Sequence, residues 1–186
     1  NRLMNNVWCI NKYFDENRVE EAVEKWIYLK KEYHDVRLHF IGGIKTKKIK
    51  QIVSFFDVIQ SIDRLSVAER IASAIEATNK KIECLIQINI GKEDQKSGVK
   101  LDELSALYHK LEERLPGSLS GFMCIPPSNE PPAIFFKEMV RLKDIYKVRN
   151  LSMGMSGDYL VALENGSNML RVGSLIFGQR NSNRNQ

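Results

Sequence analysis

The sequence predicts an α/β fold built on a parallel β-sheet. Short apolar runs rich in β-branched residues alternate along the chain with amphipathic helical segments, and the connections between them are short. The run at 82–90 is apolar almost throughout, which is typical of a parallel strand covered on both faces. A length of 186 residues with 43% hydrophobic content is enough for one well-buried core. This pattern alone leaves an open sheet and a closed barrel as alternatives.

Composition narrows the class of protein. The 28 basic and 23 acidic residues give a net charge of +5, which is mild and dispersed apart from the lysines between 45 and 50. A mild and dispersed charge is typical of a solvated surface and not of a nucleic-acid-binding groove, so no nucleic-acid partner is expected. Cys9, Cys84 and Cys124 lie far apart without a C-x-x-C pair, which predicts neither a disulfide framework nor a metal site and favours the cytoplasm. Neither a run of about 18 apolar residues nor a signal-peptide pattern is present, so no membrane partner is expected.

The first elements are helical in pattern. Residues 1–12 have the apolar spacing of an amphipathic helix that lacks its beginning, and the chain starts at Asn1, so we expect an N-terminally truncated protein. The segment that begins at Phe14 is expected to lead into a second helix that continues to about residue 33. The expected buried face of this helix consists of Val19, Ala22, Val23, Trp26 and Ile27.

The remaining elements follow as strand and helix pairs. Strands are expected at 36–41, 56–62, 82–90, 119–125, 151–155 and 168–172, and helices at 66–78, 101–115, 133–148 and 159–164. Glycine and proline residues after these segments end them, as at Pro116-Gly117. We expect residues 1–178 to form a single, incomplete barrel domain and residues 179–186, which are polar and repetitive, to form a disordered tail.

The stretch 151–178 contains the strongest candidate for a site. Its two strands end in small residues that could turn backbone N–H groups and hydroxyls toward an anion: Ser156 and Gly157 after the first, Gly173 and Ser174 after the second. Arg171 lies close by in sequence as a planar cationic donor. Short glycine turns are more often only turns, so the spacing by itself is a weak indication of a phosphate site.

The residues of this stretch and of five further segments resemble a known family. Met-Gly-Met-Ser-Gly-Asp at 153–158 and Arg-Val-Gly-Ser-Leu-Ile-Phe-Gly at 171–178 closely resemble the C-terminal signature of the pyridoxal phosphate homeostasis proteins. Segments in the family's order precede them along the chain, and these are Phe-Asp-Glu-Asn at 14–17, His-Phe-Ile-Gly at 39–42, Gln-Ile-Asn-Ile at 87–90, Lys-Ser-Gly at 96–98 and Gly-Phe-Met-Cys-Ile-Pro at 121–126. The resemblance covers nearly the whole chain, from Phe14 to Gly178.

This resemblance implies a fold and a cofactor. The family's fold is a TIM-like (β/α) barrel similar to the N-terminal domain of alanine racemase, and this chain would lack its first strand. The cofactor is pyridoxal 5′-phosphate, held as a Schiff base by a lysine at the end of that first strand. Lys12 is too close to Phe14 to occupy that place, so the Schiff-base lysine of the family has no counterpart in this chain.

The resemblance also implies which residues contact the cofactor. Its phosphate would be held by Ser156, Gly157, Arg171, Gly173 and Ser174. Asn17 and His39 would lie at the ends of other strands and face the ring.

Each of these residues has a simpler alternative role. Asn17 is also suited to a helix start, and His39, inside an alternating strand, to a packed core position. Arg171 could pair with Asp158 or Glu164. The methionines at 153, 155 and 169 are expected to fill the core, and the histidines at 34 and 109 to face solvent.

Three functions remain in competition. The preferred prediction is a protein that binds pyridoxal 5′-phosphate for intracellular homeostasis without turning over a substrate, with apoenzymes that use this cofactor as candidate recipients. The alternatives are a racemase-like enzyme on the same barrel, and a degenerate fragment that no longer binds the cofactor covalently. Asp15, which replaces the family's usual glycine, puts a carboxylate near a site meant for phosphate. The oligomeric state is left undetermined, although two unpaired strand edges could favour a dimer.

Overall fold

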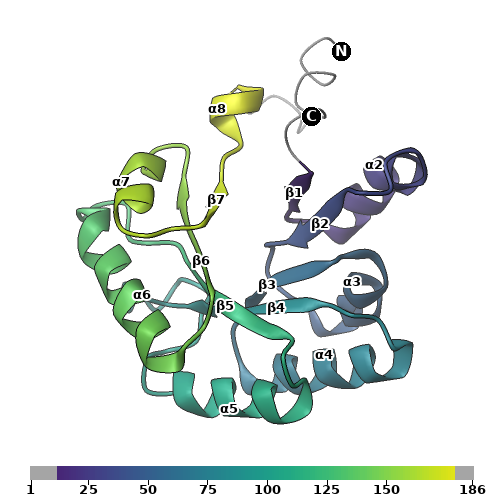
Figure 1. Cartoon of the computed structure of the whole chain (residues 1–186), viewed down its shortest axis with the longest axis horizontal. Coiled ribbons are helices and arrows are strands. Elements are labelled where there is room, and N and C mark those ends of the chain that lie inside the picture. Colours follow the sequence, from purple (N-terminus) through teal and green to yellow (C-terminus); the bar gives the residue numbers. More distant parts are fainter. Residues whose placement is uncertain (1–11, 179–186) are drawn as a thin grey trace.

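The computed structural model describes residues 12–178 as seven parallel strands that curve into a nearly closed barrel with helices around the outside (Figure 1). The strands follow one another around the sheet in chain order. Their bounds are β1 Tyr13–Glu16, β2 Arg37–Phe40, β3 Val58–Ile62, β4 Glu83–Ile88, β5 Leu119–Cys124, β6 Asn150–Met155 and β7 Met169–Arg171. Residues 1–11 of the helix expected at 1–12, and the tail expected at 179–186, lie outside the described residues.

Helices connect successive strands. Their bounds are α2 Val19–Glu32, α3 Ile49–Phe55, α4 Leu65–Thr78, α5 Leu104–Arg114, α6 Pro132–Tyr146, α7 Tyr159–Glu164 and α8 Ser174–Phe177, with a 3₁₀ turn at Thr46–Lys48 before α3. A parallel sheet with a helix in each connection is the arrangement that right-handed crossovers produce. The expectation of a TIM-like barrel is therefore confirmed, and the choice that the pattern left open is decided in favour of the barrel.

The sequence-based elements agree with the structure with a few corrections. All six expected strands are present, each within two residues of its expected ends, but a seventh strand, β1, lies where only the approach to a helix was expected. The prediction missed α3 and α8, which are short. Helix α5 begins three residues later than expected, because residues 101–103 form a turn.

Contacts with α2 explain why β1 is a strand. Alternation places Phe14 and Glu16 on the outer face, where the Phe14 ring lies 4.7 Å from that of Trp26. Glu16 accepts hydrogen bonds from Trp26 Nε1 at 2.7 Å and from Lys25 Nζ at 2.6 Å. Asp15 then faces the barrel interior and pairs in register with His39 of β2. These contacts join residues nine to twelve positions apart, so no local pattern predicts the strand.

Some apolar side chains that we expected to be buried are exposed. On α2, Val19, Ala22 and Trp26 are buried and Val23 is partly buried, but Ile27 is 43% exposed. This part of the prediction was wrong, because the buried stripe of α2 is narrower than a wide amphipathic face. Met155 is also exposed and not in the core, since it is the last residue of β6.

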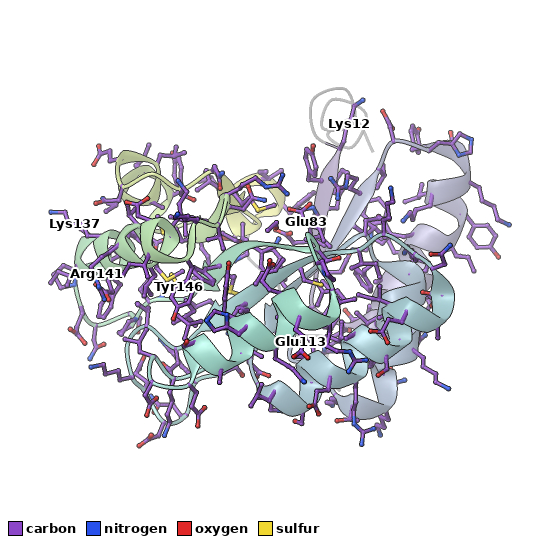
Figure 2. All side chains as sticks on the ribbon, turned by 60° about the horizontal axis from the view of Figure 1, so that its bottom comes forward. Lys12, Glu83, Glu113, Lys137, Arg141 and Tyr146 are labelled. Atoms are coloured by element: carbon purple, nitrogen blue, oxygen red, sulfur yellow. The ribbon has the colours of Figure 1, made fainter. Side chains whose placement is uncertain are left out.

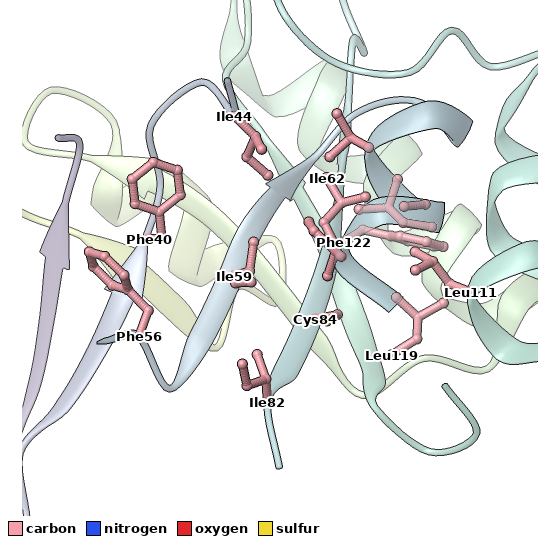
Figure 3. Packing of buried hydrophobic residues seen from close by; sticks show 14 of the residues in the cluster. Phe40, Ile44, Phe56, Ile59, Ile62, Ile82, Cys84, Leu111, Leu119 and Phe122 are labelled. Carbon is pink, nitrogen blue, oxygen red and sulfur yellow. The ribbon is translucent and has the colours of Figure 1, made fainter. Parts of the chain in front are cut away.

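The apolar residues form two layers. The larger one fills the space between sheet and helices, where Phe40 and Phe56 pack edge to face at 5.1 Å (Figure 3). A smaller group, Val58, Leu85 and Met123, is fully buried but separate from that cluster, on the inner face of the barrel. Polar side chains share this inner face, and they form the basis of the candidate site.

Charged residues cover the outside of the helices. Figure 2 shows Lys137 and Arg141 on α6 pointing away from the sheet, and Arg141 pairs with Glu138 one turn earlier. Within the described part of the chain, none of the helices is both long enough and apolar enough to cross a bilayer.

The end of β2 requires a glycine. A Cβ at Gly42 would lie 1.9 Å from the backbone oxygen of Asn17, whereas a Cβ at Gly43 would meet no atom within 4 Å. We expect Gly42→Ala to lower the free energy of unfolding by about 1.5 kcal/mol, the cost typical of overpacking a tight contact. Gly43→Ala is the matched control and should change it by less than about 0.5 kcal/mol. Urea denaturation of both variants tests this, and equal stabilities would contradict the close approach of β1 to β2.

Candidate functional site

The carboxyl ends of parallel strands meet at one rim of a barrel, and the predicted anion-binding residues lie there. Ser156 and Gly157 follow β6, and Gly173 and Ser174 follow β7. The two loops contact each other, because the Ser156 hydroxyl accepts a hydrogen bond from the Leu175 amide at 3.3 Å. The structure therefore brings together these four predicted residues, which are separated by up to 18 positions in sequence.

The loop after β6 is held by Asp158. The Asp158 carboxylate accepts a hydrogen bond from the Met155 amide at 2.6 Å, and Asp158 is the residue immediately before α7. Gly157, Gly173 and Ser174 remain exposed. In the described part of the chain, the amides of Gly173 and Ser174 donate to no backbone carbonyl. This rim thus offers free N–H groups, which is what an anion needs.

Arg171 is the last residue of β7, and its side chain turns inward from the rim. It is 7% exposed, and its guanidinium lies inside the barrel. There it donates from Nη1 to the Ser152 hydroxyl at 2.7 Å and from Nη2 to the Cys124 carbonyl at 2.8 Å. The alternative pairing with Asp158 or Glu164 is absent among the ion pairs of the described residues. Burial lowers the pKa of Arg171, while Cys124, Asp15 and Asp158 act in the opposite direction. Because a guanidinium stays protonated in proteins, a positive charge lies beneath the rim.

His39 also points into the barrel. It is 4% exposed, and its Nδ1 lies 2.7 Å from the Gln60 amide nitrogen and 3.7 Å from Asp15 Oδ1. Burial lowers its pKa to about 4, so the ring is neutral near pH 7. Its Nε2 is buried and has no hydrogen-bond partner within the described residues. His39 is therefore buried, as a core histidine would be, but it keeps one polar atom available.

Asn17 lies at the carboxyl end of β1 and is exposed. It is not the residue that precedes α2, because that position belongs to Arg18, whose side chain makes no capping hydrogen bond. Its backbone oxygen packs against Gly42, which fixes the position of the loop. The structure thus leaves its side chain available at the rim, on the β1 side of the opening.

Asp15 adds a negative charge beneath the rim. Its side chain is 25% exposed. Burial raises its pKa to about 6, Arg171 acts in the opposite direction, and Glu16 adds to the rise. At neutral pH the carboxylate is ionised beside Arg171 and partly offsets that positive charge.

Two interior residues were missed by sequence reasoning. Gln60 of β3 and Ser152 of β6 are 1% and 0% exposed, and they connect His39 to Arg171 through hydrogen bonds. The sequence signal for them was one polar residue within each apolar strand segment, because a buried polar group needs a hydrogen-bond partner. Which partners they find depends on how the sheet curves into a barrel, and the pattern along the chain does not contain that information.

Other features of the described residues supply no donor to this rim. A cavity of about 540 Å³ is at the opposite end of the barrel, where its border includes Arg37, Glu83 and Arg149 near the starts of three strands. Cys84 and Cys124 are free and buried, and burial raises the pKa of each thiol to about 12, so neither is reactive. No group of three or more His, Cys, Asp or Glu side chains among residues 12–178 is arranged to hold a metal.

Comparison with known proteins identifies the family. The model of the alanine racemase N-terminal domain matches residues 11–181. The pyridoxal phosphate homeostasis protein of Aquifex aeolicus is 36% identical over 181 residues, which cover 92% of this chain and 78% of that protein. PipY of Synechococcus elongatus, solved without pyridoxal phosphate, has a TM-score of 0.85 at 25% identity, covering 95% of this chain and 87% of that one.

Two further solved structures share the fold of this chain. PipY has also been solved with pyridoxal phosphate bound, and that structure has a TM-score of 0.82 at 25% identity, with the same coverage of both chains. Alanine racemase from Corynebacterium glutamicum has a TM-score of 0.65 at 14% identity, covering all of this chain and 53% of that one, which shows a shared fold only. The chain belongs to the alanine racemase N-terminal domain family and, within it, to the pyridoxal phosphate homeostasis proteins.

Proposed function

We propose that this chain binds pyridoxal 5′-phosphate at the carboxyl-end rim of the barrel and serves the homeostasis of this cofactor in the cytoplasm, without turning over a substrate. The contact between Ser156 and the Leu175 amide is the observation that carries the proposal, because it joins two loops rich in free donors above a buried arginine. The relative PipY, which shares this fold, has a structure with pyridoxal phosphate bound.

The phosphate fits the rim between the loops after β6 and β7. A phosphate dianion is stabilised by several N–H and O–H donors together with a nearby positive charge. Ser156, Gly157, Gly173 and Ser174 supply exposed or half-exposed donors, and Arg171 supplies the charge from below. This division of roles differs from a direct contact of Arg171 with the phosphate, since its guanidinium is engaged inside the barrel.

The ring would lie toward β1 and β2, over the interior side chains. Asn17 borders this side of the rim, and His39 has a buried nitrogen without a partner in the described residues, which fits an acceptor atom of a ligand. The bound cofactor would supply an aldehyde that reacts with amino groups. Apoenzymes that use pyridoxal phosphate are the proposed recipients.

Equilibrium dialysis of the full chain against pyridoxal 5′-phosphate tests this proposal. We expect binding, and we expect Ser156→Ala combined with Ser174→Ala to weaken it about tenfold, the loss of roughly one hydrogen bond to a charged group. Ser118→Ala is the matched control, because Ser118 precedes β5 at the opposite end of the barrel. Binding that is unchanged in the double variant would contradict the phosphate position.

Absence of turnover needs its own measurement. The chain, loaded with pyridoxal 5′-phosphate and incubated with L-alanine, is expected to form no D-alanine above the rate of free cofactor. Formation of D-alanine that disappears in the double serine variant would instead support a racemase-like enzyme.

A further inference from the structure

A chain of hydrogen bonds crosses the barrel from β7 to β2. Arg171 Nη1 donates to Ser152 Oγ at 2.7 Å, and Ser152 Oγ donates to Gln60 Oε1 at 2.5 Å. The amide nitrogen of Gln60 then lies 2.7 Å from His39 Nδ1. All four side chains are at least nine-tenths buried, and two of them are residues that the family resemblance assigns to the cofactor.

The chemistry of Arg171 fixes the direction of this chain. A guanidinium has donors and no acceptor, so Ser152 Oγ must accept from it. The single hydroxyl hydrogen of Ser152 is directed at Gln60 Oε1. If the Gln60 amide were turned over, its NH₂ group would donate to the second lone pair of Ser152, and the Ser152 hydrogen would then have no acceptor among the described residues.

The orientation of the Gln60 amide determines which ring nitrogen of His39 carries the proton. With its oxygen toward Ser152, Gln60 presents its NH₂ group to His39 Nδ1, which must be an unprotonated acceptor. A neutral imidazole carries one proton, and this proton is therefore on Nε2. Asp15 cannot reverse this assignment by direct contact, because its oxygen is 3.7 Å from Nδ1, beyond hydrogen-bond distance.

The His39 end of this series of hydrogen bonds is a donor without an acceptor among the described residues. His39 Nε2 is buried and unpartnered within the described residues. A buried polar group left unpaired costs free energy, so an unpaired buried donor points to an acceptor that the ligand-free chain lacks.

We propose that Gln60 and Ser152 are positioning residues that form a relay, a directed series of hydrogen bonds from Arg171 across the barrel to His39. The relay keeps the proton of His39 on Nε2, so that Nε2 donates a hydrogen bond to an oxygen atom on the ring of bound pyridoxal 5′-phosphate. This inference rests on the proposed function for the identity of the ligand. The protonation pattern of His39 in the ligand-free chain does not depend on that identity.

Nitrogen NMR of the full chain with ¹⁵N-labelled histidine tests the direction first. The chain has three histidines, and a spectrum of His39→Gln assigns the signals of His39. We expect Nε2 of His39 to be protonated and Nδ1 to be unprotonated. Gln60→Glu replaces the donating amide by a carboxylate, which can only accept, so a proton should move to Nδ1. Gln51→Glu, with the same change on α3 outside the barrel, is the control and should leave His39 unchanged.

Binding of pyridoxal 5′-phosphate tests the second half. We expect Gln60→Glu to weaken binding about tenfold, the factor for one lost hydrogen bond. If Gln60→Glu fails to fold, Gln60→Met removes both hydrogen bonds of Gln60 with little change in side-chain volume. His39 should then be a mixture of molecules with the proton on Nδ1 and molecules with the proton on Nε2. A proton on Nδ1 in the unmodified chain, or a pattern unchanged by Gln60→Glu, would overturn the relay.

The two proposals fail in different ways. A chain with the expected His39 pattern that does not bind pyridoxal 5′-phosphate would overturn the proposed function and support the relay. A chain that binds the cofactor equally well before and after Gln60→Glu, while the proton moves to Nδ1, would overturn the donation from His39 to the ligand and leave the proposed function standing.

Discussion

Replacing Arg171 by methionine is expected to lower the free energy of unfolding by about 3 kcal/mol and to abolish binding of pyridoxal 5′-phosphate. The Cys124 carbonyl and the Ser152 hydroxyl would lose a donor inside the barrel, and Asp15 would lose the positive charge that acts on it. Removing one member of a buried hydrogen-bond network lowers the free energy of unfolding by more than the intact network contributes to it. The reason is that the remaining polar groups stay buried without partners. Urea denaturation and equilibrium dialysis measure the two effects.

Two further substitutions separate charge from geometry. Arg171→Lys keeps the positive charge, but one ammonium group cannot reproduce a planar fork that reaches both Ser152 and Cys124, so it should restore only part of the stability. Arg149→Met removes an exposed arginine at the opposite end of the barrel and should change the free energy of unfolding by less than about 0.5 kcal/mol. If Arg171→Met were as stable as the parent chain and still bound the cofactor, the central role of this residue would be wrong.

The region 151–178 shows what a sequence can predict well. Helix α7 has the predicted bounds, Tyr159–Glu164, because a small and acidic turn precedes it and Gly166, with φ of 82°, follows it in a left-handed conformation. The two flanking strands also have their expected places. Each of these features is specified by residues within a few positions, and local chemistry is therefore sufficient.

Strand β1 shows where local chemistry is insufficient. A segment of four residues that includes Asp15 and Glu16 does not predict a strand, because charged residues are depleted in strands. The strand exists because Phe14 and Glu16 contact Trp26 of α2 and because its backbone pairs with β2. Both causes are tertiary contacts.

The interior of the barrel was also beyond local patterns. Contacts of His39 and Arg171 with the cofactor were expected from the family resemblance, but the connection between the two side chains was not. They are joined through Gln60 and Ser152, which are 92 positions apart in sequence. A polar residue in an apolar strand segment indicates that it has a hydrogen-bond partner. Only the arrangement of the strands around the barrel determines which residue that partner is.

Asp15→Asn is expected to stabilise the chain in a pH-dependent way. Burial raises the pKa of Asp15 from 3.8 to about 6, so the folded chain holds this proton more tightly than the unfolded chain. Folding is therefore penalised when the carboxylate is ionised. The penalty is absent below about pH 4, grows as the pH rises from about 4 to 6, and is complete above pH 6.

The size of this penalty follows from the shift in pKa. A shift of about 2 units corresponds to about 3 kcal/mol, which we reduce to about 2 kcal/mol because 25% of the side chain remains in water. The amide introduced by Asp15→Asn carries no charge, so this variant should be more stable than the parent by about 2 kcal/mol at pH 7.5, and the difference should vanish toward pH 4. Asp144→Asn, an equal change of charge on an exposed position of α6, should show no such pH dependence. Urea denaturation of all three chains across this pH range measures the difference, and a stabilisation that stays constant from pH 4 to 7.5 would exclude titration of Asp15 as its cause.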